Sequence, residues 1–436
     1  MNALIIALAL AAPVDSLPDL SRPWSLAQCM DWAMENNLTV LQQEDNLQGR
    51  EIDKNTAEMS WLPSVNASAS ENWSFGRGLG GNNTYESGNT SSTSFSLGSN
   101  MTLFDGLATP RRIDLARLNL DAAVKDLEKA RDDIRVSVAQ GYVQILYNYE
   151  ILDMAREQLV IDSLQVARLE GLFRSGKASA AEVSQQKASQ AQSQLTLVQA
   201  ENNLRASLLD LAQLLELPEW DGFNIVRPEI EPEPVYLGTP DDIYADALGI
   251  RPAIKAEQLR LEGARKQVDI AKSSYSPSLS LSAGLGTNYY TSFSSTSFWN
   301  QLSNNFSQYV GLSLSVPIFN KFSTRNQVRS AQLNLHSQQL QLRRAEQNLY
   351  KEIQQAWNGA VAAQAKWEAA KVATDAARDA FELMQAKYEN GKATLTEFNE
   401  TRNRLVKSQS DAAQASYEYL FQASLIQFYR GAPLSL

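Results

Sequence analysis

Few residues of this chain have the types and the spacing that chemistry would require. The 436 residues include one cysteine, Cys29, and one histidine, His336. These counts exclude a disulfide framework, a zinc site built on cysteine pairs and a histidine-rich metal centre, and they leave a Ser-His-Asp triad a single candidate base. The sequence contains neither a G-x-S-x-G nor an H-E-x-x-H motif. We therefore predict no enzyme activity, no catalytic residue, no cofactor and no metal site.

One segment approaches the pattern of a phosphate-binding loop. Residues 171–178 read Gly-Leu-Phe-Arg-Ser-Gly-Lys-Ala, whereas the loop pattern is G-x-x-x-x-G-K-[ST]. Ala178 replaces the hydroxyl residue that would hold magnesium, the segment follows a helical pattern, and Ala386 replaces the first glycine in the second copy of the repeat described below. We interpret this segment as the tip of a helix–turn–helix.

Two carboxylates form the other candidate site. Glu397 and Glu400 follow Gly391 by six and nine residues. Because residues at i and i+3 lie on one flank of a helix, both side chains point in a similar direction. Taken alone, this pattern is typical of a solvated pair in which Glu400 bonds to Arg404 one turn later.

Composition and hydropathy limit the class of protein. The chain is 44% hydrophobic and 20% charged, which suffices for a buried core, and its net charge of −10 does not favour nucleic acid. The apolar run Leu4 to Ala12 has the length of a signal-peptide core, so we predict a signal peptide over residues 1–12 although no Lys or Arg precedes the run. No later segment has 18 consecutive apolar residues, so the sequence predicts no membrane-spanning helix.

The sequence is internally duplicated. Three short motifs recur 214 or 215 positions later in the chain: 61–64 as 275–278, 103–106 as 318–321, and 175–178 as 390–393. A shared spacing of three unlike motifs indicates a repeat. We predict a first repeat over 13–216, a proline-rich linker over 217–251 and a second repeat over 252–436.

Each repeat is expected to contain a very long helix. No proline occurs between Pro110 and Pro218 or between Pro317 and Pro433. Apolar residues recur every seven positions with small residues between them, as in Ile113, Leu120, Leu127 and Ile134. This heptad seam predicts long antiparallel coiled-coil helices that turn near residues 176 and 391. A soluble coiled-coil scaffold would need the same seam.

Each repeat is also expected to contain two strands, near residues 62–105 and 277–318. Residues 279–285 and 310–316 alternate between apolar and small polar types, which is typical of strands with one apolar face. Four strands cannot close a membrane barrel, whose smallest examples have about eight, so other chains must close the edges. The expected fold is α+β, mainly α, with four strands per chain that contribute to an oligomeric barrel.

The chain resembles the TolC-type outer-membrane channel family of efflux and type I secretion systems. The resemblance rests on residues 24–30, 61–63, 103–106 and 388–392, and on the duplicated order. It implies a homotrimer with a 12-stranded transmembrane β-barrel in the outer membrane of a Gram-negative bacterium, in contact with lipid, and a large periplasmic α-barrel. It also implies an exit duct that works with a periplasmic adaptor (membrane fusion) protein and an inner-membrane pump.

The resemblance also implies functional residues. Glu397 and Glu400 match two aspartates of the family's periplasmic gate, Tyr388 matches a tip tyrosine, and Glu182 occupies the corresponding position of the first tip. Ala393 stands where the family has an arginine, so Lys392 is expected to take that role. The implied adaptor-docking tips are Gly171, Gly176, Lys177 and Gly391.

Two other interpretations stay open at this point. One is a non-channel coiled-coil scaffold with a β insert. The other is a cell-surface binding protein that uses residues 76–93 as an exposed loop. The alternating strands and the expected export signal favour a passive conduit gated at its periplasmic tip.

Overall fold

The computed structural model describes residues 22–79, 84–228, 232–234, 237–291 and 297–434. The expected signal peptide, residues 1–12, lies outside these ranges. The chain forms two compact units. Of the described residues, the first unit contains those within 22–44, 126–253 and 346–434, and the second contains those within 45–125 and 254–345.

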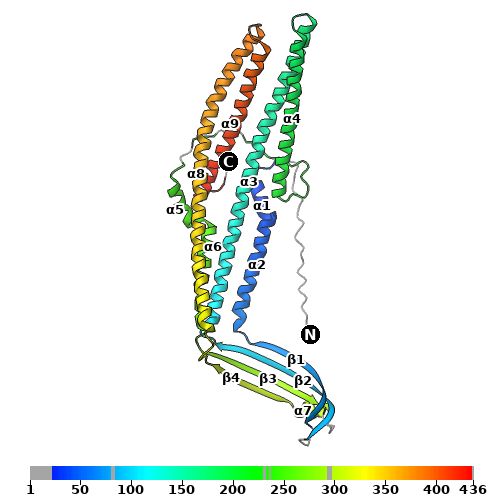
Figure 1. Ribbon diagram of the computed structural model, residues 1–436, viewed down its shortest axis with the longest axis vertical. Coiled ribbons are helices and arrows are strands. Elements are labelled where there is room, and N and C mark those ends of the chain that lie inside the picture. Colours follow the sequence, from blue (N-terminus) through cyan, green and yellow to red (C-terminus); the bar gives the residue numbers. More distant parts are fainter. Residues whose placement is uncertain (1–21, 80–83, 229–231, 235–236, 292–296, 435–436) are drawn as a thin grey trace. The chain divides into compact units, whose positions relative to one another are not determined.

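Two helical hairpins dominate the first unit (Figure 1). The first hairpin pairs α3 (Ala108–Arg174) with α4 (Ala180–Leu214), and the second pairs α8 (Ser323–Glu389) with α9 (Leu395–Tyr429). The long helix has 67 residues and the returning helix has 35 residues in both hairpins. These equal lengths agree with the duplication that the sequence predicts.

Glycines make the two hairpin turns. Gly176 and Gly391 have φ angles of 74° and 71°, which residues other than glycine rarely adopt. The amide of Gly176 donates to the carbonyl of Phe173, and the next amide donates to that of Leu172. Gly391 and its successor make the same two bonds, to Tyr388 and to a residue one position earlier. Both long helices therefore end in the same glycine-capped turn.

Two shorter helical stretches are each divided into two helices. Residues 26–59 form α1 (Leu26–Asn36) and α2 (Leu38–Glu58), followed by the short helix η1 (Met59–Trp61). Asn37 is extended between α1 and α2, and its Nδ2 donates to the carbonyl of Leu214 at 2.9 Å. The helices α5 (Pro240–Ile250), which lies within the predicted linker, and α6 (Pro252–Ser273), which begins the second repeat, are separated by Arg251. Arg251 is extended because a residue that precedes proline is excluded from the helical region.

The second unit contains one antiparallel sheet, drawn in Figure 1, with the strand order β1-β2-β3-β4. The strands are β1 (Ser64–Leu79), β2 (Tyr85–Phe104), β3 (Ser278–Tyr290) and β4 (Ser307–Ser315). A short helix, α7 (Phe298–Asn304), precedes β4. The predicted fold class, mainly helical with four strands per chain, is confirmed.

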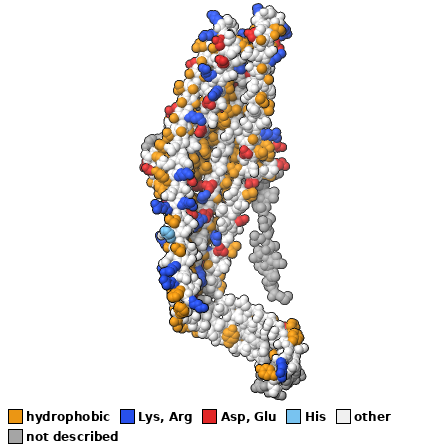
Figure 2. Space-filling view, in the orientation of Figure 1, with side chains coloured by type: hydrophobic (Ala, Val, Ile, Leu, Met, Phe, Trp, Pro, Cys, Tyr) orange, Lys and Arg blue, Asp and Glu red, His pale blue; other side chains and the backbone are white. Residues whose placement is uncertain are grey.

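The register of the sheet gives it two unlike faces. Apolar residues pair across the strands, as Leu97 does with Leu285 and Leu281 with Leu312. The opposite face carries hydroxyls and glycines, and the Oγ atoms of Ser68 and Ser96 lie 2.7 Å apart. Since residues opposite one another share a face, the register collects the apolar side chains on one side. Figure 2 shows few charged side chains over the visible face of the sheet.

Among the described residues, much of the apolar face is exposed. On β4 the side chains of Val310 and Leu312 are 78% and 68% exposed. The outer edges of β1 and β4 have no strand partner among the described residues. In the described residues, no helix combines the length and the apolar character needed to cross a membrane.

Candidate functional site at the hairpin tips

The tips of the two hairpins share one apolar core. Its buried members are Leu169 on α3, Val183 on α4, and Leu395 and Phe398 on α9. The partly buried residues packed on this core are Leu172, Ala178, Phe381 and Tyr388. The heptad pattern positions these residues, because side chains three and four apart line one stripe of each helix. The core therefore joins all four helices at the tips.

Each returning helix begins with a capping box that contains one of the predicted acidic residues. At the first tip, Ser179 donates to the Glu182 carboxylate through its amide at 2.7 Å and its hydroxyl at 2.8 Å. At the second tip, Thr394 donates to the Glu397 carboxylate through both groups at 2.8 Å. The amides of both glutamates donate back to the capping hydroxyls. The two carboxylates are thus held at helix N-termini.

These caps shift the acidity of both glutamates. Hydrogen bonds from the backbone amide and then the hydroxyl of Thr394 lower the pKa of Glu397 below its usual value. The same two groups of Ser179 lower the pKa of Glu182. Because hydrogen bonds to a carboxylate stabilise its charged form, both side chains are ionised at neutral pH.

Tyr388 lies between the two hairpins. Its ring stacks on Phe398 with a centroid distance of 4.7 Å, and the Arg168 guanidinium lies 5.5 Å from the ring centroid. Burial raises the pKa of Tyr388, and the nearby charge of Arg168 opposes that shift. The predicted gate tyrosine is therefore a packed contact between α8, α9 and α3.

The other predicted tip residues are exposed. Glu400 lies three residues after Glu397 on the surface of α9, and in the described part of the chain it forms no ion pair with Arg404. Lys177 and Lys392 are exposed at the two turns. The three predicted docking glycines would accept a Cβ without meeting a neighbour within 4 Å: Gly171, Gly176 and Gly391.

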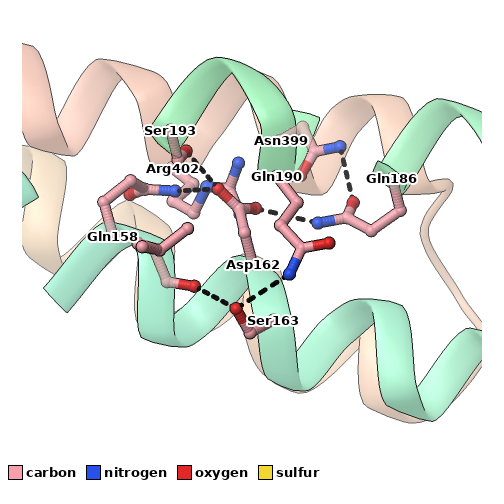
Figure 3. Close-up of polar contacts among 9 residues, drawn as sticks. Gln158, Asp162, Ser163, Gln186, Gln190, Ser193, Asn399 and Arg402 are labelled. Atoms are coloured by element: carbon pink, nitrogen blue, oxygen red, sulfur yellow. Dashed lines mark hydrogen bonds and ion pairs between the residues drawn. The ribbon is translucent and has the colours of Figure 1, made fainter. Parts of the chain in front are cut away.

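A buried polar network lies next to the tip core, and the sequence analysis did not identify it (Figure 3). Asp162 on α3 is 0% exposed, and its carboxylate accepts a bond from the Arg402 guanidinium on α9, which is 3% exposed. Three further groups donate to the same carboxylate: Gln186 Nε2 at 2.8 Å, Ser193 Oγ at 2.5 Å and Gln158 Nε2 at 2.9 Å. The ion pair joins residues 240 positions apart and links the two hairpins.

A second contact crosses the same boundary. Asn399 Nδ2 on α9 donates to Gln186 Oε1 on α4 at 3.3 Å. Gln190 Nε2 donates to Ser163 Oγ at 3.0 Å within the first hairpin. The sequence does hold a signal for this network, because Asp162 continues the seven-residue spacing of the seam that includes Ile134. A charged residue at a seam position requires a buried partner.

The residues at the tips supply charged side chains and packed apolar contacts. The described residues contain no group of three His, Cys, Asp or Glu side chains that could hold a metal ion. His336 is exposed on α8, and Cys29 is buried, which raises the pKa of its thiol to about 12. The Gly171–Ala178 segment has the end of α3 and a glycine turn in place of a strand and loop.

Comparisons with known proteins agree with this architecture. The family model described as outer membrane efflux protein matches residues 30–216 and 243–429. Outer membrane protein TolC of Escherichia coli is 25% identical over 79% of this chain and 71% of its own length. Protein CyaE of Bordetella pertussis is 25% identical over 95% of this chain and 83% of its own.

Solved structures share the fold. The CmeC outer membrane channel of Campylobacter jejuni superposes with a TM-score of 0.80 at 19% identity, covering 94% of this chain and 87% of that chain. The matching family model covers both repeats with their hairpins. The chain therefore belongs to the outer membrane efflux protein family and is a subunit of an outer-membrane channel for efflux or secretion.

Proposed function

We propose that this chain forms the exit duct of a tripartite efflux pump or a type I secretion system. It acts as a passive conduit without enzyme activity. The observation that supports this proposal best is a sheet with an uncovered apolar face and two unpaired edges in a chain whose helices end in two matching hairpin tips. Such a sheet needs lipid on one face and strand partners at both edges.

The strand edges support a homotrimer. A four-stranded sheet cannot close on itself, because the smallest transmembrane barrels have about eight strands. Three copies would supply twelve strands if the β1 edge of one copy paired with the β4 edge of the next. The apolar face would then meet lipid, and the hydroxyl face would line the pore. The resemblance to the family supports the number three.

The tips support a gate. In a trimer, Glu397 and Glu400 would form two rings of three carboxylates at the periplasmic end. The caps keep Glu397 and Glu182 charged, so the constriction would attract cations and repel anions. Tyr388 would hold the closed arrangement through its packing between hairpins, and Lys392 would supply a positive charge at the turn.

The turns support docking of a partner. A trimer offers six hairpin ends of two related kinds, which suits a periplasmic adaptor protein that connects the duct to an inner-membrane pump. The exposed turn positions would make this contact: Gly171, Gly176, Lys177 and Gly391.

Two measurements test the proposal. Native mass spectrometry of the detergent-solubilised protein should give three chains, and a stable membrane-inserted monomer would refute the trimer. The purified protein in a planar lipid bilayer should conduct ions and prefer cations over anions. A protein that inserts into lipid without conducting would refute the duct.

A further inference from the structure

We propose that the buried Asp162–Arg402 ion pair is a register pin, meaning a contact that fixes how far one hairpin is displaced along the other. The pin is a positioning contact for the tip carboxylates Glu182 and Glu397, which lie on the two hairpins that it joins. Its effect on the gate rests on the proposed function. Its effect on the alignment of the hairpins does not.

The apolar tip core cannot set this register by itself. Hydrophobic contacts are non-directional, and a heptad seam presents similar apolar residues after each displacement. A slide of one helical turn, about 5.4 Å, would bring other seam residues into contact. The same slide would separate the Asp162 carboxylate from Arg402 and leave two opposite charges buried without each other. A buried ion pair therefore penalises wrong registers far more than apolar packing does.

The details of the network point to specificity. Among the described residues, Arg402 Nε, Asn399 Oδ1 and Gln158 Oε1 are buried without a hydrogen-bond partner. A network selected for stability would satisfy these atoms, because each unpaired buried polar atom costs free energy. Buried ion pairs are weak evidence for stability, and their best-attested use is to fix register.

The repeat gives a second, independent indication. In the other copy of the repeat, Ala377 corresponds to Asp162 and Lys187 corresponds to Arg402. Lys187 instead forms an exposed ion pair with Glu170 within the first hairpin, at 2.7 Å. The corresponding residues, Ala377 and Lys187, therefore cannot form an equivalent buried ion pair. The Asp162–Arg402 pair marks the contact of α3 with α9 and not the related contact of α8 with α4.

The test measures alignment directly in the full chain. A cysteine pair, Gln186→Cys with Asn399→Cys, replaces the hydrogen bond that crosses between the hairpins. Because Gln186 is also one of the donors to Asp162, every variant is compared with a parent that carries this cysteine pair and keeps Asp162 and Arg402. A control pair, Thr374→Cys with Ser408→Cys, reports on α8 and α9 within the second hairpin, where the Thr374 hydroxyl donates to the Ser408 carbonyl at 2.9 Å. Both pairs are built in a Cys29→Ala background. Mild oxidation of the detergent-solubilised protein is followed by mass spectrometry of the linked peptides.

The decisive variant is Asp162→Leu with Arg402→Met, which removes both charges and keeps the site apolar. We expect the yield of the 186–399 link to fall at least 5-fold, while the yield of the 374–408 link stays the same. Arg402→Lys keeps the charge and should keep the 186–399 yield within 2-fold. An unchanged 186–399 yield in the double variant would overturn the pin.

A second variant keeps the test decisive if the double variant does not fold. Asp162→Asn removes only the charge, and we expect a fall of about 3-fold in the 186–399 yield, whereas a yield equal to that of the parent would overturn the pin. Neither link requires conduction or export. If the links behave as expected while the bilayer shows no conductance, the pin stands and the proposed duct fails. If the channel conducts and both variants keep the parent yield, the duct stands and the pin fails.

Discussion

The cap of α9 offers a direct test of how the tip carboxylate is held. Thr394→Ala removes the hydroxyl that accepts from the Glu397 amide at 3.3 Å and donates to the Glu397 carboxylate at 2.8 Å. One bond of the capping box then remains, from the backbone amide of residue 394 to that carboxylate. We expect the first turn of α9 to open more often and the Glu397 side chain to lose its fixed direction.

The expected magnitude follows from the cap. Replacement of a capping threonine by alanine costs about 1 kcal/mol, within a range of roughly 0.5–2 kcal/mol. Because 1.4 kcal/mol corresponds to a factor of ten, local opening of the turn should increase about 5-fold. The pKa of Glu397 should also move back toward its usual value, since the hydroxyl is one of the two groups that lower it.

The effect should depend on pH in a defined direction. A carboxyl whose pKa is lowered by folding stabilises the folded state above its unfolded pKa, and this contribution is lost as the pH falls through the folded pKa. For Glu397 the unfolded value is 4.5. Thr394→Ala and wild type should therefore differ in the free energy of opening this turn. The share of that difference that depends on the charged carboxylate should be complete at pH 7 and should shrink below about pH 4.5.

Hydrogen exchange with mass spectrometry over residues 391–400 measures the opening. Thr401→Ala is the matched control, because that hydroxyl donates to the Glu397 carbonyl at 2.9 Å within the helix and does not cap it. Ser179→Ala should affect the first tip by a similar amount, since its bonds have nearly the same lengths. Equal exchange in Thr394→Ala and wild type, or an equal increase in Thr401→Ala, would refute the reasoning.

Three further predictions concern charge, docking and backbone strain. Glu397→Gln with Glu400→Gln should reduce cation selectivity in a bilayer, and unchanged selectivity would mean that these side chains do not face the pore. Gly171→Arg should abolish export but preserve trimer assembly, because a Cβ added at this exposed position meets no neighbour within 4 Å; normal export would exclude docking there. Gly106→Ala should destabilise the protein by more than about 1 kcal/mol, because φ is positive and the new Cβ would lie 2.5 Å from Ser276 Cβ. Lys321→Gly, at the corresponding position with φ of 53°, should stabilise it by about 1 kcal/mol in urea unfolding, and a loss of stability would contradict this.

Much of the fold could be predicted from the sequence, because the apolar residues of its helices and strands recur at regular spacings and the order of elements is duplicated. The heptad seam and the glycine turns predict both hairpins, and strict alternation predicts β3 and β4. The breaks at Asn37 and Arg251 have different causes. The first depends on a side-chain bond to Leu214, which is distant in the sequence, and the second follows from the proline at position 252.

The strands of the first repeat lie within the expected range, residues 62–105, but the sequence does not mark their exact bounds. The first half of β2, residues 87–94, is a run of Ser, Thr, Asn and Gly in which no apolar residue marks the period. Pairing with neighbouring strands sets these bounds, and this information is tertiary.

The candidate site was predicted in part, for a physical reason. Turn glycines and N-terminal acidic residues have local signatures, so the positions of Gly176, Gly391, Glu182 and Glu397 at helix ends could be read from the sequence. The network around Asp162 depends on a residue 240 positions away. Its sequence signal is a charged residue on an apolar seam, which shows that a partner is needed but does not identify Arg402.

The two repeats share the glycine turn and the capping box, but only one of the two related contacts between hairpins has a buried ion pair. This difference bears on how the tips move. Both copies retain the glycine turn and the capping box, so every hairpin presents an ordered, charged end. The buried ion pair joins α3 to α9 and has no counterpart from the exchanged repeats. In a closed ring of hairpins, contacts within a chain would alternate with contacts between chains. The Asp162–Arg402 ion pair would hold the two hairpins of one chain in a fixed alignment. Rearrangement at the tips would therefore occur mainly at the contacts between hairpins of different chains.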